Sequence, residues 1–206
     1  MTNPVPPDGP FPAGAIAGVD ETVIYHGGGV TYALAGVVFL DAQRARRAFQ
    51  QLTANRKRAF HWRTEGSTLR EEAVTLLENH IAATYVLART AGRRQQVNAR
   101  RELLAYLVAE LTNDGIDHLI IESQGTTPDG RDRNTILDSF QANRSGPAFT
   151  YEWRTKTEPL LWYPDALAGV AHESLAYGQT QHFERLQKAR VATEVHYVAD
   201  QPPENA

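Results

Sequence analysis

The fold is decided by the stretch Ala15-Ile16-Ala17-Gly18-Val19-Asp20-Glu21-Thr22-Val23-Ile24-Tyr25. Its small apolar beginning and its β-branched and aromatic end predict a β-strand. Asp20 and Glu21 lie in the middle of this strand, where a carboxylate buried without partners is costly. Because successive strand side chains point to opposite faces, we expect only one of the two acids, Asp20, to serve a given site. The alternative is an exposed or edge strand that carries two solvated acids.

Residues 15–40 are predicted to form a β-hairpin, because the turn signal His26-Gly27-Gly28-Gly29 separates this strand from a second one over 30–40. The glycine run lacks the lysine and the following helix that a phosphate-binding loop needs. Further strands are expected at 60–62, 81–87, 116–121, 149–153 and 191–198, and a loop at 125–131. Helices are expected at 42–55, 68–79, 95–113, 132–143, 160–177 and 180–190, with Asp41 capping the first and Thr68-Leu69-Arg70-Glu71 forming a capping box for the second. This order predicts an α/β domain with a mixed sheet flanked by helices.

Length and composition indicate one globular domain. The 206 residues are 42% hydrophobic and 22% charged, with no cysteine. The lack of cysteine excludes disulfides, thiolate zinc sites and a cysteine nucleophile, and it fits a reducing, cytoplasmic location. No apolar run approaches ~18 residues, so we expect no membrane span and no membrane partner. We expect the domain to cover residues 13–199, with a disordered Pro- and Gly-rich arm at 1–12 and a disordered tail at 200–206.

Positive charge is concentrated in two parts of the chain, although the formal net charge is −3. The segment from Arg44 to Arg63 contains seven basic residues and no acid, and a second basic cluster runs from Arg89 to Arg101. Arginine binds phosphates through two parallel hydrogen bonds, so these segments favour a polyanionic partner such as DNA or RNA. A solvated helix face is the alternative. The expected nucleic-acid contacts are Arg56, Lys57, Arg58, Arg63, Arg93 and Arg94.

Three acids stand out by their position. Asp20 lies within the first strand, and Glu122 follows the buried strand 116–121, at the end where open α/β sheets place their ligand sites. Asp165 begins a helix whose small residues allow it to lie close to the sheet. Three carboxylates brought together repel each other unless cations neutralise them, and oxygen ligands favour Mg²⁺ or Mn²⁺. The alternatives are a helix cap or an ion pair with Arg131 or Arg133 for Glu122, and a helix-dipole interaction for Asp165.

Several secondary residues are candidates for the same site. His172 follows Asp165 by seven residues, so it shares a helix face with this acid and could assist proton transfer, or it could simply pack. His61 is predicted as a strand-end core residue or a substrate contact. Asp129 and Asp132 could supplement a metal site, or they could belong to a turn. Ser123 lacks the surroundings of a serine hydrolase nucleophile.

Two motifs resemble a known family. Asp20-Glu21-Thr22 resembles the Asp-Glu-Ser start of the bacterial domain of unknown function 3800 family, with Thr22 in place of serine. That family's late helix motif has leucine, glutamine, a variable residue, alanine and aspartate, followed by an apolar pair, alanine and glycine. It is similar to Leu161-Trp162-Tyr163-Pro164-Asp165-Ala166-Leu167-Ala168-Gly169. The family in turn resembles the ribonuclease-H-like superfold of nucleases, transposases and integrases.

The resemblance spans most of residues 15–177 and implies a ribonuclease-H-like mixed central sheet, led by a β-hairpin and flanked by helices. It implies catalytic, metal-binding acids at Asp20, Glu122 and Asp165. His172 is added to the expected catalytic residues because of its spacing to Asp165. A fourth acid would be Glu65, Glu71 or Glu72. The implied activity is hydrolysis of nucleic-acid phosphodiesters with two Mg²⁺ or Mn²⁺ ions ~3.5–4 Å apart. The alternatives are an inactive interaction module of a mobile-element or defence system, and a metal-dependent hydrolase of a small phosphorylated molecule.

Overall fold

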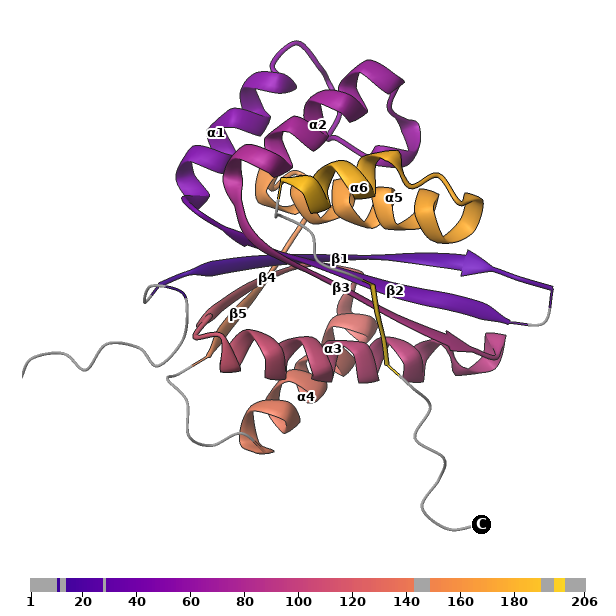
Figure 1. Cartoon of the computed structure of the whole chain (residues 1–206). Coiled ribbons are helices and arrows are strands. Elements are labelled where there is room, and N and C mark those ends of the chain that lie inside the picture. Colours follow the sequence, from indigo (N-terminus) through magenta and orange to yellow (C-terminus); the bar gives the residue numbers. More distant parts are fainter. Residues whose placement is uncertain (1–10, 12–13, 28, 143–148, 190–194, 199–206) are drawn as a thin grey trace, which may run out of the picture.

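A six-stranded mixed sheet forms the middle layer of the protein (Figure 1). The computed structural model describes residues 11, 14–27, 29–142, 149–189 and 195–198. Within them the strand order is β5-β4-β1-β2-β3-β6. β2 is antiparallel to β1 and β3, whereas β4 is parallel to β1 and β5, and β6 is parallel to β3. The strands are β1 (Ile16–Tyr25), β2 (Val30–Phe39), β3 (Ile81–Ala91), β4 (His118–Glu122), β5 (Thr150–Arg154) and β6 (Val195–Tyr197).

Helices cover both faces of this sheet, which confirms the expected layered architecture (Figure 1). One face carries α1 (Ala42–Leu52), α2 (Ser67–His80), α5 (Trp162–Tyr177) and α6 (Gln181–Lys188). The other carries α3 (Gln96–Asn113) and α4 (Thr126–Ala142). Three short 3₁₀ turns, η1 (Trp62–Thr64), η2 (Arg93–Gln95) and η3 (Pro159–Leu161), join these elements. No helix in the described part of the chain is long and apolar enough to cross a membrane.

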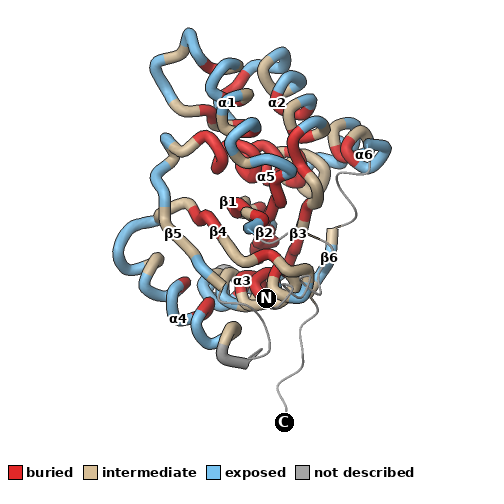
Figure 2. Tube along the Cα trace, turned by 90° about the vertical axis from the view of Figure 1, so that its left-hand side faces the viewer, coloured by how far each residue is buried: buried red, intermediate tan, exposed pale blue. Residues whose placement is uncertain are grey.

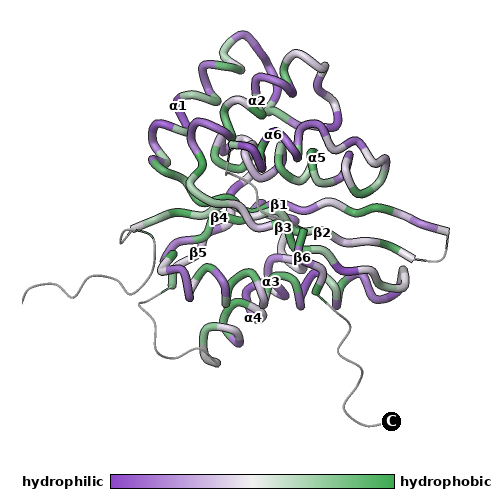
Figure 3. Tube along the Cα trace, in the orientation of Figure 1, coloured by the Kyte–Doolittle hydropathy of each residue, from purple (hydrophilic) through white to green (hydrophobic). Residues whose placement is uncertain are grey.

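Each face of the sheet has its own hydrophobic core. Phe49, Leu77 and Tyr163 belong to the core under α5, and Leu107 and Leu119 belong to the core under α3. Buried residues therefore concentrate along the sheet and the inner sides of the helices (Figure 2), where the chain is also most hydrophobic (Figure 3). The helical spacing of the leucines in α3 predicts this buried stripe correctly.

The central strand lies directly beneath α5. A Cβ atom on Gly18 would lie 3.5 Å from Pro164 Cγ at the beginning of that helix. Gly169, in the middle of α5, leaves the space for the Trp62 ring, which a Cβ atom there would meet at 2.1 Å. The small residues of α5 thus do allow close packing, both on the sheet and against η1. This packing brings the first turn of α5 to the middle of β1.

Several local predictions are wrong or shifted. Residues 60–62 do not form a strand, because Trp62 begins a 3₁₀ turn and packs under α5. Residues 126–131 are helical, since α4 begins at Thr126 in spite of its glycine and proline. The N-cap of α2 is Gly66, so the expected capping box is absent. Asp41 does cap α1, accepting a hydrogen bond from the Arg44 amide (2.9 Å).

Two boundaries follow from backbone geometry. β3 extends to Ala91 because it pairs along the whole of β2, a long-range contact that no local pattern reports. The helix predicted at 160–177 ends at Gly178, whose φ of 66° favours glycine and separates α5 from α6. Apart from Phe11, the predicted arm at 1–12 lies outside the described residues, as do the tail at 200–206 and residues 191–194 of the last predicted strand.

Candidate active site

Asp20, in the middle of β1, and Glu122, at the end of β4, lie side by side on two neighbouring strands. The parallel register of β1 and β4 ends with the pair Val19 and Ile121, so Asp20 and Glu122 are the next residues along the two strands. Gly18 faces α5 and side chains alternate, so Asp20 also faces α5, while Glu21 faces α3. The prediction that the two acids serve different faces agrees with this geometry.

Asp165 reaches the same place from the first turn of α5. Its Oδ1 accepts a hydrogen bond from His61 Nδ1 (2.8 Å), and its Oδ2 accepts one from the Trp62 backbone amide (2.7 Å). An ionised carboxylate only accepts, so His61 carries its proton on Nδ1. Both Asp20 and Asp165 are buried, with 6% of each residue exposed. Asp20, Glu122 and Asp165 together are called the acid cluster below.

Lys156 neutralises part of the acid cluster. It lies between β5 and η3, and its Nζ is 3.5 Å from Glu122 Oε2 and 3.4 Å from Asp165 Oδ1. Burial alone would lower the pKa of Lys156, but the negative charges of Asp165, Asp20 and Glu122 outweigh burial and raise it. Lys156 is therefore held in its charged form beside the acids. The expected ion pairs of Glu122 with Arg131 or Arg133 are not formed; its partner is this lysine.

Asp20 and Asp165 differ strongly in their proton affinity. Burial raises the pKa of Asp20 well above its usual range, and the charges of Asp165, Glu21 and Glu122 raise it further. Burial acts in the same direction on Asp165, but the hydrogen bond from His61, the charge of Lys156 and the Trp62 amide together lower its pKa. Two neighbouring carboxyl groups whose pKa values move apart can act as a proton donor and a fixed anion.

A cavity of about 570 Å³ opens beside Asp165. His172 also lines it, which confirms that the two residues share a face of α5, and His172 Nδ1 lies 2.8 Å from Thr22 Oγ1. Burial and the charge of Arg63 lower the pKa of His172, so this imidazole is neutral at pH 7. His61 borders the same cavity and its side chain is 44% exposed, so it is not the core residue that we predicted.

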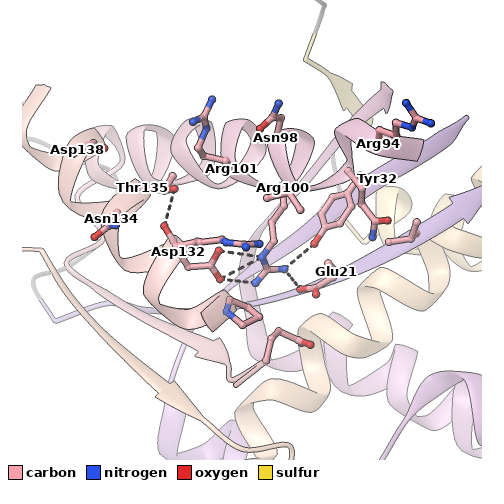
Figure 4. Close-up of a pocket in the computed structure, with 16 residues that line it drawn as sticks. Glu21, Tyr32, Arg94, Asn98, Arg100, Arg101, Asp132, Asn134, Thr135 and Asp138 are labelled. Carbon is pink, nitrogen blue, oxygen red and sulfur yellow. Dashed lines mark hydrogen bonds and ion pairs between the residues drawn. The ribbon is translucent and has the colours of Figure 1, made fainter. Parts of the chain in front are cut away.

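A second cavity, of about 650 Å³, lies on the opposite face of the sheet between α3 and α4 (Figure 4). Arg100 extends from α3 into its centre. There it pairs with Glu21 (2.5 Å) and with Asp132 (2.7 Å), and it donates a hydrogen bond to the Tyr32 hydroxyl (2.7 Å). Glu21 and Asp132 are thus bound to an arginine on the far side of the sheet from Asp20.

The other acids considered in the sequence have separate partners. Asp129 accepts hydrogen bonds from Ser123 Oγ (2.5 Å) and the Gln124 amide (2.8 Å), which stabilises the beginning of α4. Glu65 pairs with Arg56 and Arg58, and Glu71 pairs with His182 and Arg185. Glu72 is exposed on α2. None of these residues supplies a fourth acid to the acid cluster.

The carboxylate oxygens of the acid cluster are suitable ligands for a divalent cation, but their positions in this structure do not form a binding site for one. Three carboxylates are the hard oxygen donors that Mg²⁺ and Mn²⁺ prefer. Among the described residues, however, no group of three or more Asp, Glu or His side chains is close enough to hold one metal ion. Asp165 already accepts two hydrogen bonds, and Lys156 contacts the oxygen atoms of Glu122 and Asp165 that would bind the ion. As arranged here, the residues do not form a metal site.

The basic residues expected to contact nucleic acid are divided between several surfaces. Arg63 borders the cavity beside Asp165, and Arg94 borders the cavity on the other face of the sheet. Arg56 and Arg58 both form ion pairs with Glu65, and Lys57 is exposed. The side chain of Arg93 lies outside the described part of the structure. Of the expected contacts whose side chains the structure describes, only Arg63 borders the cavity beside Asp165.

Comparisons with known proteins bear on the fold. Ribonuclease HII from Archaeoglobus fulgidus, in its complex with PCNA, superposes with a TM-score of 0.50 over 91% of this chain and 83% of its own, at 18% sequence identity. No family model matches the chain, and no curated protein matches it. The likeness confirms the predicted ribonuclease-H-like fold. Membership of the domain of unknown function 3800 family stays a prediction.

Two residues of the site have no clear signal in the sequence. Lys156 is one of three lysines in the chain and follows the end of β5, next to the strand that ends in Glu122. Its position at the carboxyl end of a parallel strand is the signal that would have found it. His61 was assigned to a strand, so its side chain was expected to be in the core.

Proposed function

We propose that this protein is a nuclease-like phosphodiester hydrolase that acts on nucleic acid through the acid cluster. The observation that supports the proposal is the convergence of Asp20, Glu122 and Asp165 from two strands and a late helix, an arrangement that leaves Asp20 with a strongly raised pKa. Strongly perturbed pKa values are concentrated at functional sites, and Asp165, a neighbour of Asp20, borders the cavity described above. The fold shared with a ribonuclease is consistent with this chemistry.

The surroundings of the acid cluster suit a nucleic-acid strand. Arg63 supplies an exposed positive charge at the cavity, which also has Tyr25 and Tyr177 on its border. The two tyrosines are 65% and 68% exposed, and exposed aromatic rings provide stacking surfaces for unpaired bases. Phosphate contacts from arginine and stacking contacts from tyrosine together favour a single-stranded segment over a small phosphorylated molecule.

The protein's own residues have defined roles in this proposal. Asp20, whose pKa is raised, is the acid that gives a proton to the leaving oxygen, and Asp165, whose pKa is lowered, stays ionised. His61 orients Asp165 through its Nδ1–H group. His172 is neutral and hydrogen-bonded to Thr22, so it can accept a proton at the border of the cavity. Mg²⁺ or Mn²⁺ stays a prediction for a state in which Lys156 has left the acids.

A second candidate function is supported by Lys156. Its contacts with Glu122 and Asp165 satisfy part of the acid cluster without a metal ion, as an inactive nucleic-acid-binding module on this fold would require. The two candidates differ in one measurable property, the cleavage of a bound strand.

The test is a cleavage assay with fluorescently labelled single-stranded DNA, single-stranded RNA and an RNA–DNA hybrid, each with and without 5–10 mM Mg²⁺ or Mn²⁺. We expect cleavage of at least one substrate, and a loss of about 10²–10³-fold in rate for Asp20→Asn. The matched control is Asp138→Asn, at an exposed position of α4 on the other face of the sheet, which should keep the activity. Binding without cleavage in all conditions would favour the inactive module. Full activity in Asp20→Asn would refute the proposed role of the acid cluster.

A further inference from the structure

The acid cluster carries more negative charge than the described groups around it neutralise. Three carboxylates meet one ammonium group, that of Lys156, and one imidazole, that of His61. A buried group of like charges is unstable without a positive charge among them. The cation in this structure is a side chain, and it contacts the oxygen atoms that a metal ion would need.

Lys156 is held in place by its backbone. Its carbonyl oxygen accepts a hydrogen bond from Trp162 Nε1 (2.6 Å), which fixes it to the beginning of α5, two residues before Pro164. The Glu158 amide donates to the Thr155 carbonyl (2.9 Å), which closes a turn around Lys156. The position of the lysine above the acids therefore follows from the fold, and its flexible four-carbon side chain is the part that can move.

The ammonium group and a metal ion cannot both occupy this position. Mg²⁺ binds oxygen at 2.0–2.1 Å, and the Lys156 Nζ atom is 3.5 Å from Glu122 Oε2 and 3.4 Å from Asp165 Oδ1, so an ion bound to these two atoms would lie within a few ångström of the ammonium group. Two cations at that separation repel each other strongly. The Lys156 side chain is 33% exposed, so it has a path to solvent if it is displaced.

We propose that the Lys156 ammonium group is the resident cation of the acid cluster and occupies the position of a divalent metal ion, so that removing this side chain turns the cluster into a divalent-cation site. The proposal concerns the cation and not the reaction, so it holds or fails independently of the proposed nuclease activity.

The test is calorimetric titration of MnCl₂ into the full-length protein at pH 7 without nucleic acid, comparing wild type with Lys156→Met. We expect Lys156→Met to bind Mn²⁺ at least about tenfold more tightly than wild type, because a positive charge has left the site. Lys188→Met is the matched control, since Lys188 is exposed at the end of α6 and should leave the affinity unchanged. Adding Asp20→Asn to Lys156→Met should abolish the gain.

Thermal unfolding provides a second measurement. Mn²⁺ should raise the Tm of Lys156→Met more than that of wild type, because a ligand that binds only the folded state stabilises it. If Lys156→Met does not fold without metal, Lys156→Gln, which keeps a polar side chain, takes its place. Equal Mn²⁺ affinity in wild type and variant would overturn the proposal, as would absent binding in both or a gain that survives Asp20→Asn.

Discussion

Asp20 and Glu21 are neighbours in the sequence, yet they lie in opposite environments on the two faces of β1. Glu21 meets Arg100 at 2.5 Å, and the same guanidinium group binds Asp132 and Tyr32. Asp20 meets two other acids, and its pKa is strongly raised. The Glu21 side is electrostatically satisfied and holds α3, α4 and β1 together. The Asp20 side is electrostatically strained, which is typical of a functional site.

The largest expected effect is on the satisfied side. Arg100→Met leaves the buried Asp132 and the partly buried Glu21 without a cation, so we expect a loss of about 3–5 kcal/mol in the free energy of unfolding. Urea denaturation monitored by circular dichroism measures this loss. Arg101→Met, at the adjacent exposed position, should change stability by no more than about 0.5 kcal/mol. If the two variants unfold at the same urea concentration, Arg100 does not have the structural role assigned to it.

On the Asp20 side, removing a charged group should increase the free energy of unfolding. Asp20→Asn removes a carboxyl group whose ionisation is opposed by burial and by the neighbouring acids, so we expect it to stabilise the protein by about 0.5–2 kcal/mol at pH 7. The raised pKa means that Asp20 ionises more readily in the unfolded chain. Wild type therefore loses stability as the pH rises from the ordinary Asp value of about 3.9 towards the raised one, and Asn avoids this loss.

The gain from Asp20→Asn should accordingly be small near pH 4 and increase towards neutral pH, in denaturation curves taken at several pH values. Glu21→Gln should instead destabilise the protein at neutral pH, because it removes a partner of Arg100. A gain from Asp20→Asn that is independent of pH would contradict the electrostatic explanation.

The smallest expected effect is a change in affinity for a nucleic-acid strand, and it tests which face of the sheet binds that strand. Arg63 lies on the Asp20 side and Arg94 on the Glu21 side. We expect Arg63→Ala to weaken binding of a labelled single strand by a few-fold, about 1 kcal/mol, and to reduce the slope of log affinity against log salt by about 1. Arg94→Ala should change neither quantity. Fluorescence anisotropy at several KCl concentrations distinguishes the two; a larger effect from Arg94→Ala would move the binding surface to the other face.

The parts of the fold that local sequence determines were predictable. The hairpin of β1 and β2 follows from strand residues around a glycine turn, and α3 follows from its leucine spacing. The opposite orientation of Asp20 and Glu21 follows from the two-residue period of a strand. The placing of Glu122 at a strand end and of Asp165 on a closely packed helix also used local features, together with a family resemblance.

The parts that depend on long-range contacts were not predictable. Lys156 neutralises acids from β4 and α5; the sequence shows that it follows a strand end, but not that it meets Asp165 on a distant helix. His61 was assigned to a strand because its neighbours are aromatic, whereas Trp62 in fact packs against Gly169. Likewise, Arg100 was counted in a surface basic cluster, although it lies between two acids inside the protein.

The pair of adjacent acids also restricts how the hairpin can align during folding. All ten residues of β2 are buried, so this strand has no alternation of apolar and polar residues that would fix its pairing register with β1. A slip of β1 by one residue would turn Asp20 towards Arg100 and Glu21 towards Asp165. The longer glutamate would then enter the crowded side, and the shorter aspartate would have to span the distance to the guanidinium group. Two charged side chains of unequal length thus select one pairing register for a hairpin whose apolar residues would allow more than one.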